Sequence, residues 1–214
     1  MDKPRQQTLS LSVREKGVDA IVISKYQSLA MRTSPEDGHD RVINGCMGLI
    51  GESGEIVDLI KKWKFQSGKN AELPKEKLIE ECGDVLWYCA ELSTGLNADM
   101  GVIFSKTAHH FDDLHKINEA VPLEVTVTRL AAMAVSPSVY LFDGVLIGER
   151  EKINKHFLEA RTKSDIVGII FVIKDILELF CNTSLEDAME HNIEKLRKRY
   201  PDGFDPERSL HREK

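Results

Sequence analysis

The sequence has no apolar run long enough to cross a membrane, since a spanning helix needs about 20 consecutive apolar residues. Its N-terminal stretch, MDKPRQQTLSLSVREKG, is charged and lacks the apolar centre of a secretory signal. We therefore expect a cytoplasmic protein with no membrane partner.

Cysteine pairs at metal-binding or redox spacing are also missing. The four cysteines, Cys46, Cys82, Cys89 and Cys181, form no CxxC pair and no cysteine–histidine zinc spacing. Their neighbours are largely apolar, which predicts buried free thiols in a reducing compartment.

Positive charge is not in excess. The 214 residues include 29 Lys and Arg against 35 Asp and Glu, for a net charge of −6. This balance argues against a nucleic-acid partner, which usually needs a basic domain. The basic stretch KLRKRY near the C-terminus fits the end of a helix, where cations are favoured. A local lysine cluster could still hold a small anionic substrate.

Strand patterns are few and apolar repeats of period 3.6 are many, so the sequence predicts a single all-α domain over residues 1–214. Ser184 and Asp187 have the spacing of a capping box, and a Pro-Asp-Gly stop begins at Pro201. Residues 136–149 are ambiguous between strand and helix. The expected helices cover residues 19–32, 41–65, 73–95, 98–120, 122–135, 164–181 and 183–200.

Four glycines recur every third residue within residues 41–65: Gly45, Gly48, Gly51 and Gly54. Glycine costs helix stability, so this spacing predicts close approach by another backbone or a ligand. For Gly45 alone, the alternative is a loop before a helix that starts near Leu49.

Two pairs of acids stand at the same helical spacing. Glu52 and Glu55 are three residues apart, and so are Glu81 and Asp84, with apolar residues at matching offsets around each pair. Each pair should therefore lie on an apolar stripe. Because carboxylates that converge on a buried face repel one another, they need a cation. Oxygen ligands favour Mg²⁺, with Mn²⁺ as the alternative. A Glu-x-x-His spacing is missing, so Lewis-acid chemistry fits better than redox chemistry.

Lysines and aromatic residues near the acids fit a nucleotide. Mg²⁺ is commonly held by carboxylates together with substrate phosphates, and lysines can pair with those phosphates. The alternatives without a binding role are a solvated acidic face, a lysine-rich loop and aromatic residues in the core. The residues concerned are Lys61, Lys62 and Lys64 for phosphate, and Trp63 and Tyr88 for a base.

The segments GLIGESGEIVDLIKKW and EECGDVLWY resemble the ExxE…ExxD signature of the all-α nucleoside triphosphate pyrophosphohydrolases, the MazG-like and dimeric dUTPase-like superfamily. YQSLAMRT resembles the first helix of that family, and SLEDAMEHNIEKLRKRYPDGF resembles its closing helix. The similarity covers about residues 25–95 and 180–205. Residues 97–165 resemble no part of the short members, so we expect an inserted helical segment there.

The resemblance implies a site and a reaction. It assigns Glu52, Glu55, Glu81 and Asp84 to one or more Mg²⁺ ions and to catalysis. The implied products are a nucleoside monophosphate and pyrophosphate, released by attack of an activated water on phosphorus. dUTP and dCTP are the substrates expected by analogy, and a homodimer or dimer of dimers is the expected assembly. The implied nucleotide contacts are Lys61, Lys62, Trp63, Lys64, Tyr88, Asn192, Lys195, Arg199 and Tyr200.

One position departs from the family pattern. Some relatives have a glutamate, assigned as general base, where this chain has Gly51. The base could then be Glu52, Glu55 or Glu80. Two alternatives to the expected function remain: hydrolysis of phosphoribosyl-ATP, and a non-catalytic helical protein that senses nucleotides or acts in assembly.

The stretch HHFDDLH allows two interpretations. Its histidines and aspartates could bind a transition metal. A solvated face with ordinary side-chain pairs is the commoner outcome for such a stretch.

Overall fold

The computed structural model describes residues 19–35, 40–68, 70–151 and 155–210. Within these ranges the regular elements are all helical and no strand is present, which confirms the predicted all-α class. The elements are a helix over residues 19–30, η1 (Met31–Thr33), α2 (Arg41–Phe65), α3 (Lys75–Gly95), α4 (Met100–Thr107), η2 (Ala108–Phe111), α5 (Asp112–Glu119), α6 (Leu123–Glu151), α7 (Lys155–Asp175), η3 (Ile176–Cys181), α8 (Leu185–Arg199) and α9 (Pro206–Leu210).

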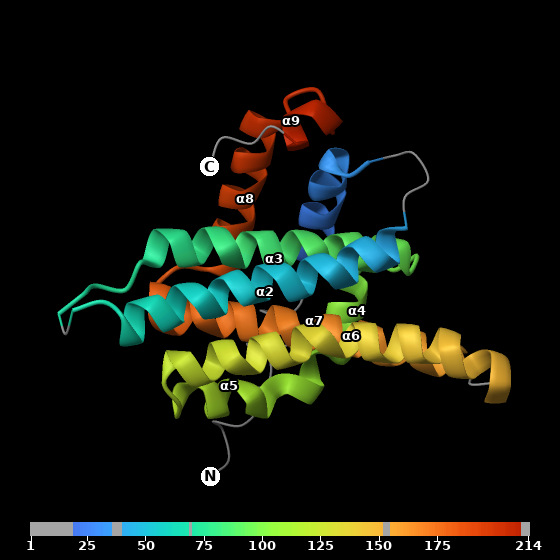
Figure 1. The fold of residues 1–214 in the computed structure, drawn as a ribbon, viewed down its shortest axis with the longest axis horizontal. Coiled ribbons are helices and arrows are strands. Elements are labelled where there is room, and N and C mark those ends of the chain that lie inside the picture. The colour runs from blue at the N-terminus through green and yellow to red at the C-terminus, as the bar shows by residue number, and fades with distance from the viewer. Residues whose placement is uncertain (1–18, 36–39, 69, 152–154, 211–214) are drawn as a thin grey trace, which may run out of the picture.

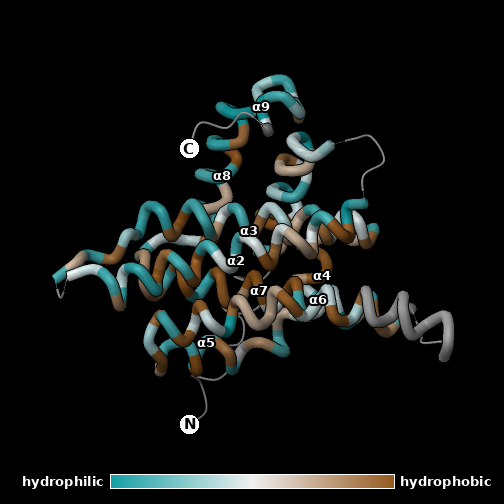
Figure 2. The backbone as a smooth tube through the Cα atoms, viewed as in Figure 1, coloured by the Kyte–Doolittle hydropathy of each residue, from teal (hydrophilic) through white to brown (hydrophobic). Residues whose placement is uncertain are grey.

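Two long helical hairpins, α2–α3 and α6–α7, form the body of the molecule (Figure 1). α2 packs against α3 on one side and α6 on the other, and α6 packs against α7. The apolar run from Ile166 to Ile173 in α7 is buried in the core. Figure 2 shows hydrophobic segments gathered where α2, α6 and α7 meet. Each large apolar side chain buried there contributes about 1.5–3 kcal/mol to folding.

The predicted close approach at glycines holds for two of the four positions. A Cβ on Gly45 would lie 2.9 Å from Leu92 Cα, and a Cβ on Gly48 would lie 2.1 Å from the Tyr88 ring. The other two glycines meet nothing within 4 Å. Gly45 therefore lets α2 and α3 approach closely, and Gly48 leaves room for the Tyr88 ring between them.

The start of α2 excludes the loop interpretation of Gly45. The helix begins at Arg41, and the Asp40 carboxylate accepts hydrogen bonds from the Val42 and Ile43 amides. This cap satisfies orphan amides at the helix N-terminus and places Gly45 inside the helix.

In the middle of the chain the structure settles one open alternative and differs from prediction in two places. Residues 123–151 form one helix that passes through Pro137, so the ambiguous stretch is helical. Packing of α6 on α2 and α7 outweighs the hydrogen bond that proline cannot donate. The helix expected over residues 98–120 is instead divided into α4, η2 and α5. The helix expected over residues 164–181 starts earlier, at Lys155, and ends in the π-helical turn η3.

α8 and the helix of residues 19–30 stand on the α3 side of the bundle (Figure 1). The Ser184–Asp187 capping box is confirmed, with both of its reciprocal hydrogen bonds formed. α8 approaches α3 closely, because a Cβ on Gly83 would lie 2.9 Å from Asn192 Cβ. This contact brings side chains of α8 beside the second acid pair.

All four cysteines are buried and free, as predicted. Among the described residues, none of the helices has the length and apolar character needed to cross a membrane.

Candidate active site

Three of the four predicted acids converge between α2 and α3. One carboxylate oxygen from each of Glu52, Glu55 and Glu81 lies within 4.8 Å of the others. Glu81 is buried and Glu52 half-buried, but Glu55 is exposed. The expectation that both members of each pair lie on a buried stripe is therefore wrong for Glu55. Three residues along a helix is about 60° short of a full turn, which places Glu55 at the rim of the face.

The electrostatics of this cluster favour a cation. Burial, followed by the charges of Asp84, Glu55 and Glu81, raises the pKa of Glu52 to about 7, with Lys195 acting in the opposite direction. Burial also raises the pKa of Glu81, although Lys77 lowers it in part. The cluster therefore carries negative charge that its neighbours do not fully offset.

Asp84, the fourth acid, is bound by α8. Lys195 Nζ lies 2.5 and 2.6 Å from its two carboxylate oxygens. Asn192 Nδ2 donates to Asp84 Oδ1 at 3.1 Å, and Tyr26 donates its hydroxyl proton to Asn192 Oδ1 at 2.8 Å. This chain of contacts orients Asp84 from a helix more than 100 residues later in the sequence.

A second lysine, Lys77, flanks the cluster. Its Nζ lies 2.8 Å from Glu81 Oε1 and 3.3 Å from Glu80 Oε2. Lys195 also approaches Glu80, at 3.5 Å. Burial raises the pKa of Glu80, but the two lysines outweigh burial and hold it below its usual value. Glu80 is thus an ion-paired carboxylate beside the cluster.

A cavity of about 380 Å³ opens next to the acids. This volume falls within the range of small-molecule sites, about 300–1,000 Å³. Five of the predicted site residues line it: Glu52, Asp84, Tyr88, Arg199 and Tyr200. The other lining residues are Thr33, Pro35, Asn44, Trp87, Leu196, Phe204 and Ser209.

Two aromatic side chains of α3 form one wall of the cavity. Trp87 and Tyr88 meet edge to face, with ring centroids 4.9 Å apart. Trp87 Nε1 donates to Thr33 Oγ1 at 3.0 Å, which fixes the indole against η1. The wall is thus a rigid aromatic surface beside a polar, acidic end.

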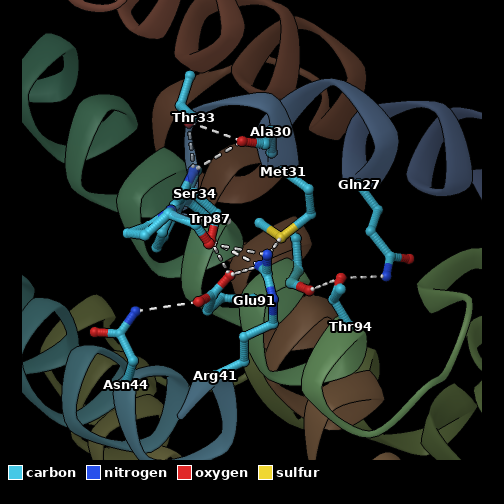
Figure 3. Close-up of polar contacts among 12 residues, drawn as sticks. Gln27, Ala30, Met31, Thr33, Ser34, Arg41, Asn44, Trp87, Glu91 and Thr94 are labelled. Carbon is cyan, nitrogen blue, oxygen red and sulfur yellow. Dashed lines mark hydrogen bonds and ion pairs between the residues drawn. The ribbon is translucent and has the colours of Figure 1, made fainter. Parts of the chain in front are cut away.

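A buried polar network includes Asn44, one of the residues that line the cavity (Figure 3). Glu91 is fully buried and accepts hydrogen bonds at 2.8 Å from Arg41 and from the Ser34 hydroxyl. Asn44 Nδ2 donates to the other Glu91 oxygen at 3.3 Å, and Arg41 donates to the Pro35 carbonyl at 3.1 Å. The network joins α2, α3 and the segment after η1.

Six of the nine predicted substrate contacts do not line the cavity. Asn192 and Lys195 bind Asp84 instead, and the other four make contacts elsewhere. Lys61 and Lys62 each pair with Asp58 at 2.5 Å, and Lys64 pairs with Glu124 at 3.0 Å. Trp63 packs on the core, and its Nε1 donates to the Ala71 carbonyl at 3.0 Å.

Sequence reasoning missed several residues that the structure places here. Trp87 is next to the predicted Tyr88, but adjacent residues of a helix do not share a face, so its spacing from Tyr88 did not indicate it. Lys77 stands four residues before Glu81, so helical spacing could have indicated that lysine. Asn44 and Pro35 had no such signal, because the network around Glu91 sets their positions.

The histidine-rich stretch forms ordinary side-chain pairs. His115 Nδ1 lies 2.5 Å from Asp175 Oδ1 at the end of α7. The His109 and His110 rings contact each other, with centroids 3.9 Å apart. Among the described residues, the acid cluster of Glu52, Glu55 and Glu81 is the group that could hold a metal.

The donor set of this cluster fits a hard divalent cation. Its three groups are carboxylates, which suit Mg²⁺ and Mn²⁺ better than softer metals. The raised pKa of Glu52 marks the charge that such a cation would offset.

Comparison with known proteins agrees with the geometry. Residues 45–119 match the sequence profile of the MazG nucleotide pyrophosphohydrolase domain, which confirms the resemblance to the all-α pyrophosphohydrolases. Gene 37 protein of Mycobacterium phage L5 is 36% identical over 58 residues, which are 27% of this chain and 51% of that protein. The match thus spans about half the length of this relative. No solved structure matches the chain.

Proposed function

Since residues 45–119 match the MazG nucleotide pyrophosphohydrolase domain, we propose that this protein hydrolyses a nucleoside triphosphate to its monophosphate and pyrophosphate with Mg²⁺. One observation carries the proposal: a cluster of three carboxylates stands at the edge of an aromatic-walled cavity of about 380 Å³. The cluster suits a metal bound to phosphates, and the cavity suits a nucleoside.

The residues have distinct proposed roles. Glu52, Glu55 and Glu81 would hold the cation, with Asp84 as a further ligand beside them. The cation would supply Lewis-acid polarisation of the phosphate and activation of water. Trp87 and Tyr88 would pack against the base and sugar. Lys195 and Arg199, two of the predicted nucleotide contacts, lie on α8 beside the acids and would pair with the phosphates.

The ion pairs around Glu80 reduce the number of candidates for the general base. Because Lys77 and Lys195 hold the pKa of Glu80 low, this carboxylate is a poor proton acceptor. Glu52 and Glu55 are the remaining candidates.

The first test is pyrophosphate release from a panel of ribo- and deoxynucleoside triphosphates, with Mg²⁺, Mn²⁺ or EDTA. We expect metal-dependent release that falls by at least about 100-fold in Glu81→Gln, because this change removes a ligand charge without changing shape. Glu72→Gln, at an exposed loop position, is the matched control and should retain activity. Metal-independent release, or full activity in Glu81→Gln, would contradict the metal assignment.

The same assay with phosphoribosyl-ATP added to the panel separates the alternatives. Turnover of phosphoribosyl-ATP with no turnover of triphosphates would move the function to that substrate. Thermal stabilisation by nucleotides without any pyrophosphate would support a sensor.

We also propose that the protein forms a homodimer or dimer of dimers through the exposed face of α2. Ile43, Met47 and Ile50 stand at helical spacing and expose 42%, 67% and 42% of their surface. The open glycines Gly51 and Gly54 lie on the same helix. An apolar stripe next to glycines without neighbours lets another helix approach closely.

A further inference from the structure

The end of the cavity near Asn44, away from the acids, is suited to recognising a base. Asn44 and Glu52 both belong to α2 and both line the cavity. Eight residues of helix separate them by about 12 Å along the axis. This is comparable to the span from a base edge to the phosphates. With the phosphates at the acids, the edge of the base farthest from the sugar reaches Asn44.

The orientation of the Asn44 amide is fixed by Glu91. A carboxylate paired with a guanidinium accepts hydrogen bonds and donates none. Asn44 therefore turns its NH₂ group to Glu91 Oε1, at 3.3 Å, and its carbonyl oxygen away from it (Figure 3). Among the described residues, no donor is bonded to that oxygen.

The other polar groups at this end are already engaged. The Thr33 hydroxyl donates to the Ala30 carbonyl at 2.7 Å and accepts from Trp87 Nε1 at 3.0 Å. The Pro35 carbonyl accepts from Arg41. Among Thr33, Pro35 and Asn44, the group left to meet a base is therefore an acceptor, Asn44 Oδ1.

We propose that Asn44 selects cytosine over uracil and thymine, and that Glu91 enforces the choice by locking the Asn44 amide. This inference rests on the proposed nucleotide hydrolysis and names its substrate class. The 4-substituent of a pyrimidine lies opposite the bond to the sugar, so it reaches farthest into the cavity. Cytosine carries an amino group there and donates to Asn44 Oδ1. Uracil and thymine carry an oxygen, which would face another acceptor and leave both unpaired.

Sugar-matched substrates test the selection. We expect kcat/KM for dCTP to exceed that for dUTP by about tenfold or more, with CTP and UTP in the same order. A triphosphate of 4-unsubstituted pyrimidin-2-one should fall between them, because it has neither donor nor opposing oxygen. Equal or better use of dUTP overturns the proposal.

Variants test the part played by Glu91. Glu91→Gln keeps the shape but lets the amide of Asn44 turn over, so the dCTP/dUTP ratio should fall to within about threefold of unity. Asn44→Leu should also lose the preference, and it carries the test if Glu91→Gln does not fold. Asp165→Asn, a half-buried carboxylate bonded to Ser136, is the matched control and should keep the wild-type ratio. A folded Glu91→Gln or Asn44→Leu that keeps the full preference overturns the proposal.

A binding readout separates this inference from the hydrolysis itself. Calorimetry of dCTP and dUTP with Glu81→Gln measures base preference without turnover. If Glu81→Gln binds dCTP preferentially but the wild-type protein releases no pyrophosphate, the base selection stands and the proposed hydrolysis is wrong. Pyrophosphate release by the wild-type protein with no preference between dCTP and dUTP would support the hydrolysis and overturn the base selection.

Discussion

At the scale of single residues, equal spacing produces unequal environments. The two acid pairs have the same three-residue spacing, yet Glu81 is buried, Glu55 is exposed, and Asp84 is bound to Lys195. The pKa of Glu52 rises to about 7 because burial and three neighbouring acids act on it together. The chemistry of each acid is thus set by what packs against it.

The two tryptophans should differ in their effect on nucleotide binding. Trp87 lines the cavity, so Trp87→Ala should raise the Kd for dCTP about tenfold, the loss expected when a stacking surface is removed. Trp63→Ala should change it less than about twofold, because Trp63 packs on the core and bonds to Ala71. Calorimetry in the Glu81→Gln background measures both. A larger loss for Trp63→Ala would place that residue, and not Trp87, against the base.

Sequence periodicity predicted that the acids would lie together, and Glu52, Glu55 and Glu81 do, because the face of a helix follows from 3.6 residues per turn. It also predicted that Tyr88 lies near the acids, and Tyr88 lines the same cavity as Glu52 and Asp84. It could not distinguish Trp87 from Trp63, because the wall that includes Trp87 depends on hydrogen bonds to Thr33, which lies 54 residues away in the chain. Asn44 has no sequence signal either, since its orientation depends on Glu91, 47 residues later.

At the scale of elements, short helices of the middle segment are tied to the core by polar contacts. His115 of α5 pairs with Asp175 at the end of α7, and Asn118 donates to the other Asp175 oxygen at 2.6 Å. Arg129 of α6 donates in turn to Asn118. Apolar periodicity does not report such contacts. The single helix expected from residues 98–120 is therefore three elements in the structure.

The His115–Asp175 pair should make stability depend on pH. Its hydrogen bond to Asp175 raises the pKa of His115 above its usual value, partial burial opposes this, and Glu119 and Glu178 add to the rise. A raised folded-state pKa gives stability that is complete below pH 6.5 and is lost as pH rises through the folded value. Because His115 is partly exposed, the loss between pH 6 and 8 should be below about 1 kcal/mol.

Chemical denaturation of wild type and His115→Gln across this range checks the expectation. The difference between their free energies of unfolding should shrink as pH rises. A difference that grows with pH would show that His115 is not stabilised in its charged form.

At the scale of the whole molecule, the chain forms two long helical hairpins, and the acid cluster lies on the first of them, α2–α3. The segment expected as an insertion supplies α6, which packs along α2, and the middle of the core is completed by α7 (Figure 1). α8 then closes the α3 side. The cavity therefore lies among elements from both ends of the sequence.

The exposed stripe of α2 should determine the oligomeric state. Met47→Glu places a charge in the apolar stripe and should convert a dimer or tetramer into a smaller species in light scattering. Val102→Glu, an exposed apolar position on α4, is the control and should not change the mass. An unchanged assembly in Met47→Glu would exclude this face as the interface.

The contact between Lys195 and Asp84 spans 111 residues of sequence. During synthesis, α2 and α3 leave the ribosome long before α8 does, at about 5–20 residues per second. The acids can thus meet while Asp84 still lacks its lysine and its asparagine. The newborn chain therefore passes several seconds with a negative, half-built site, whose charge Lys195 begins to offset only when the last long helix docks.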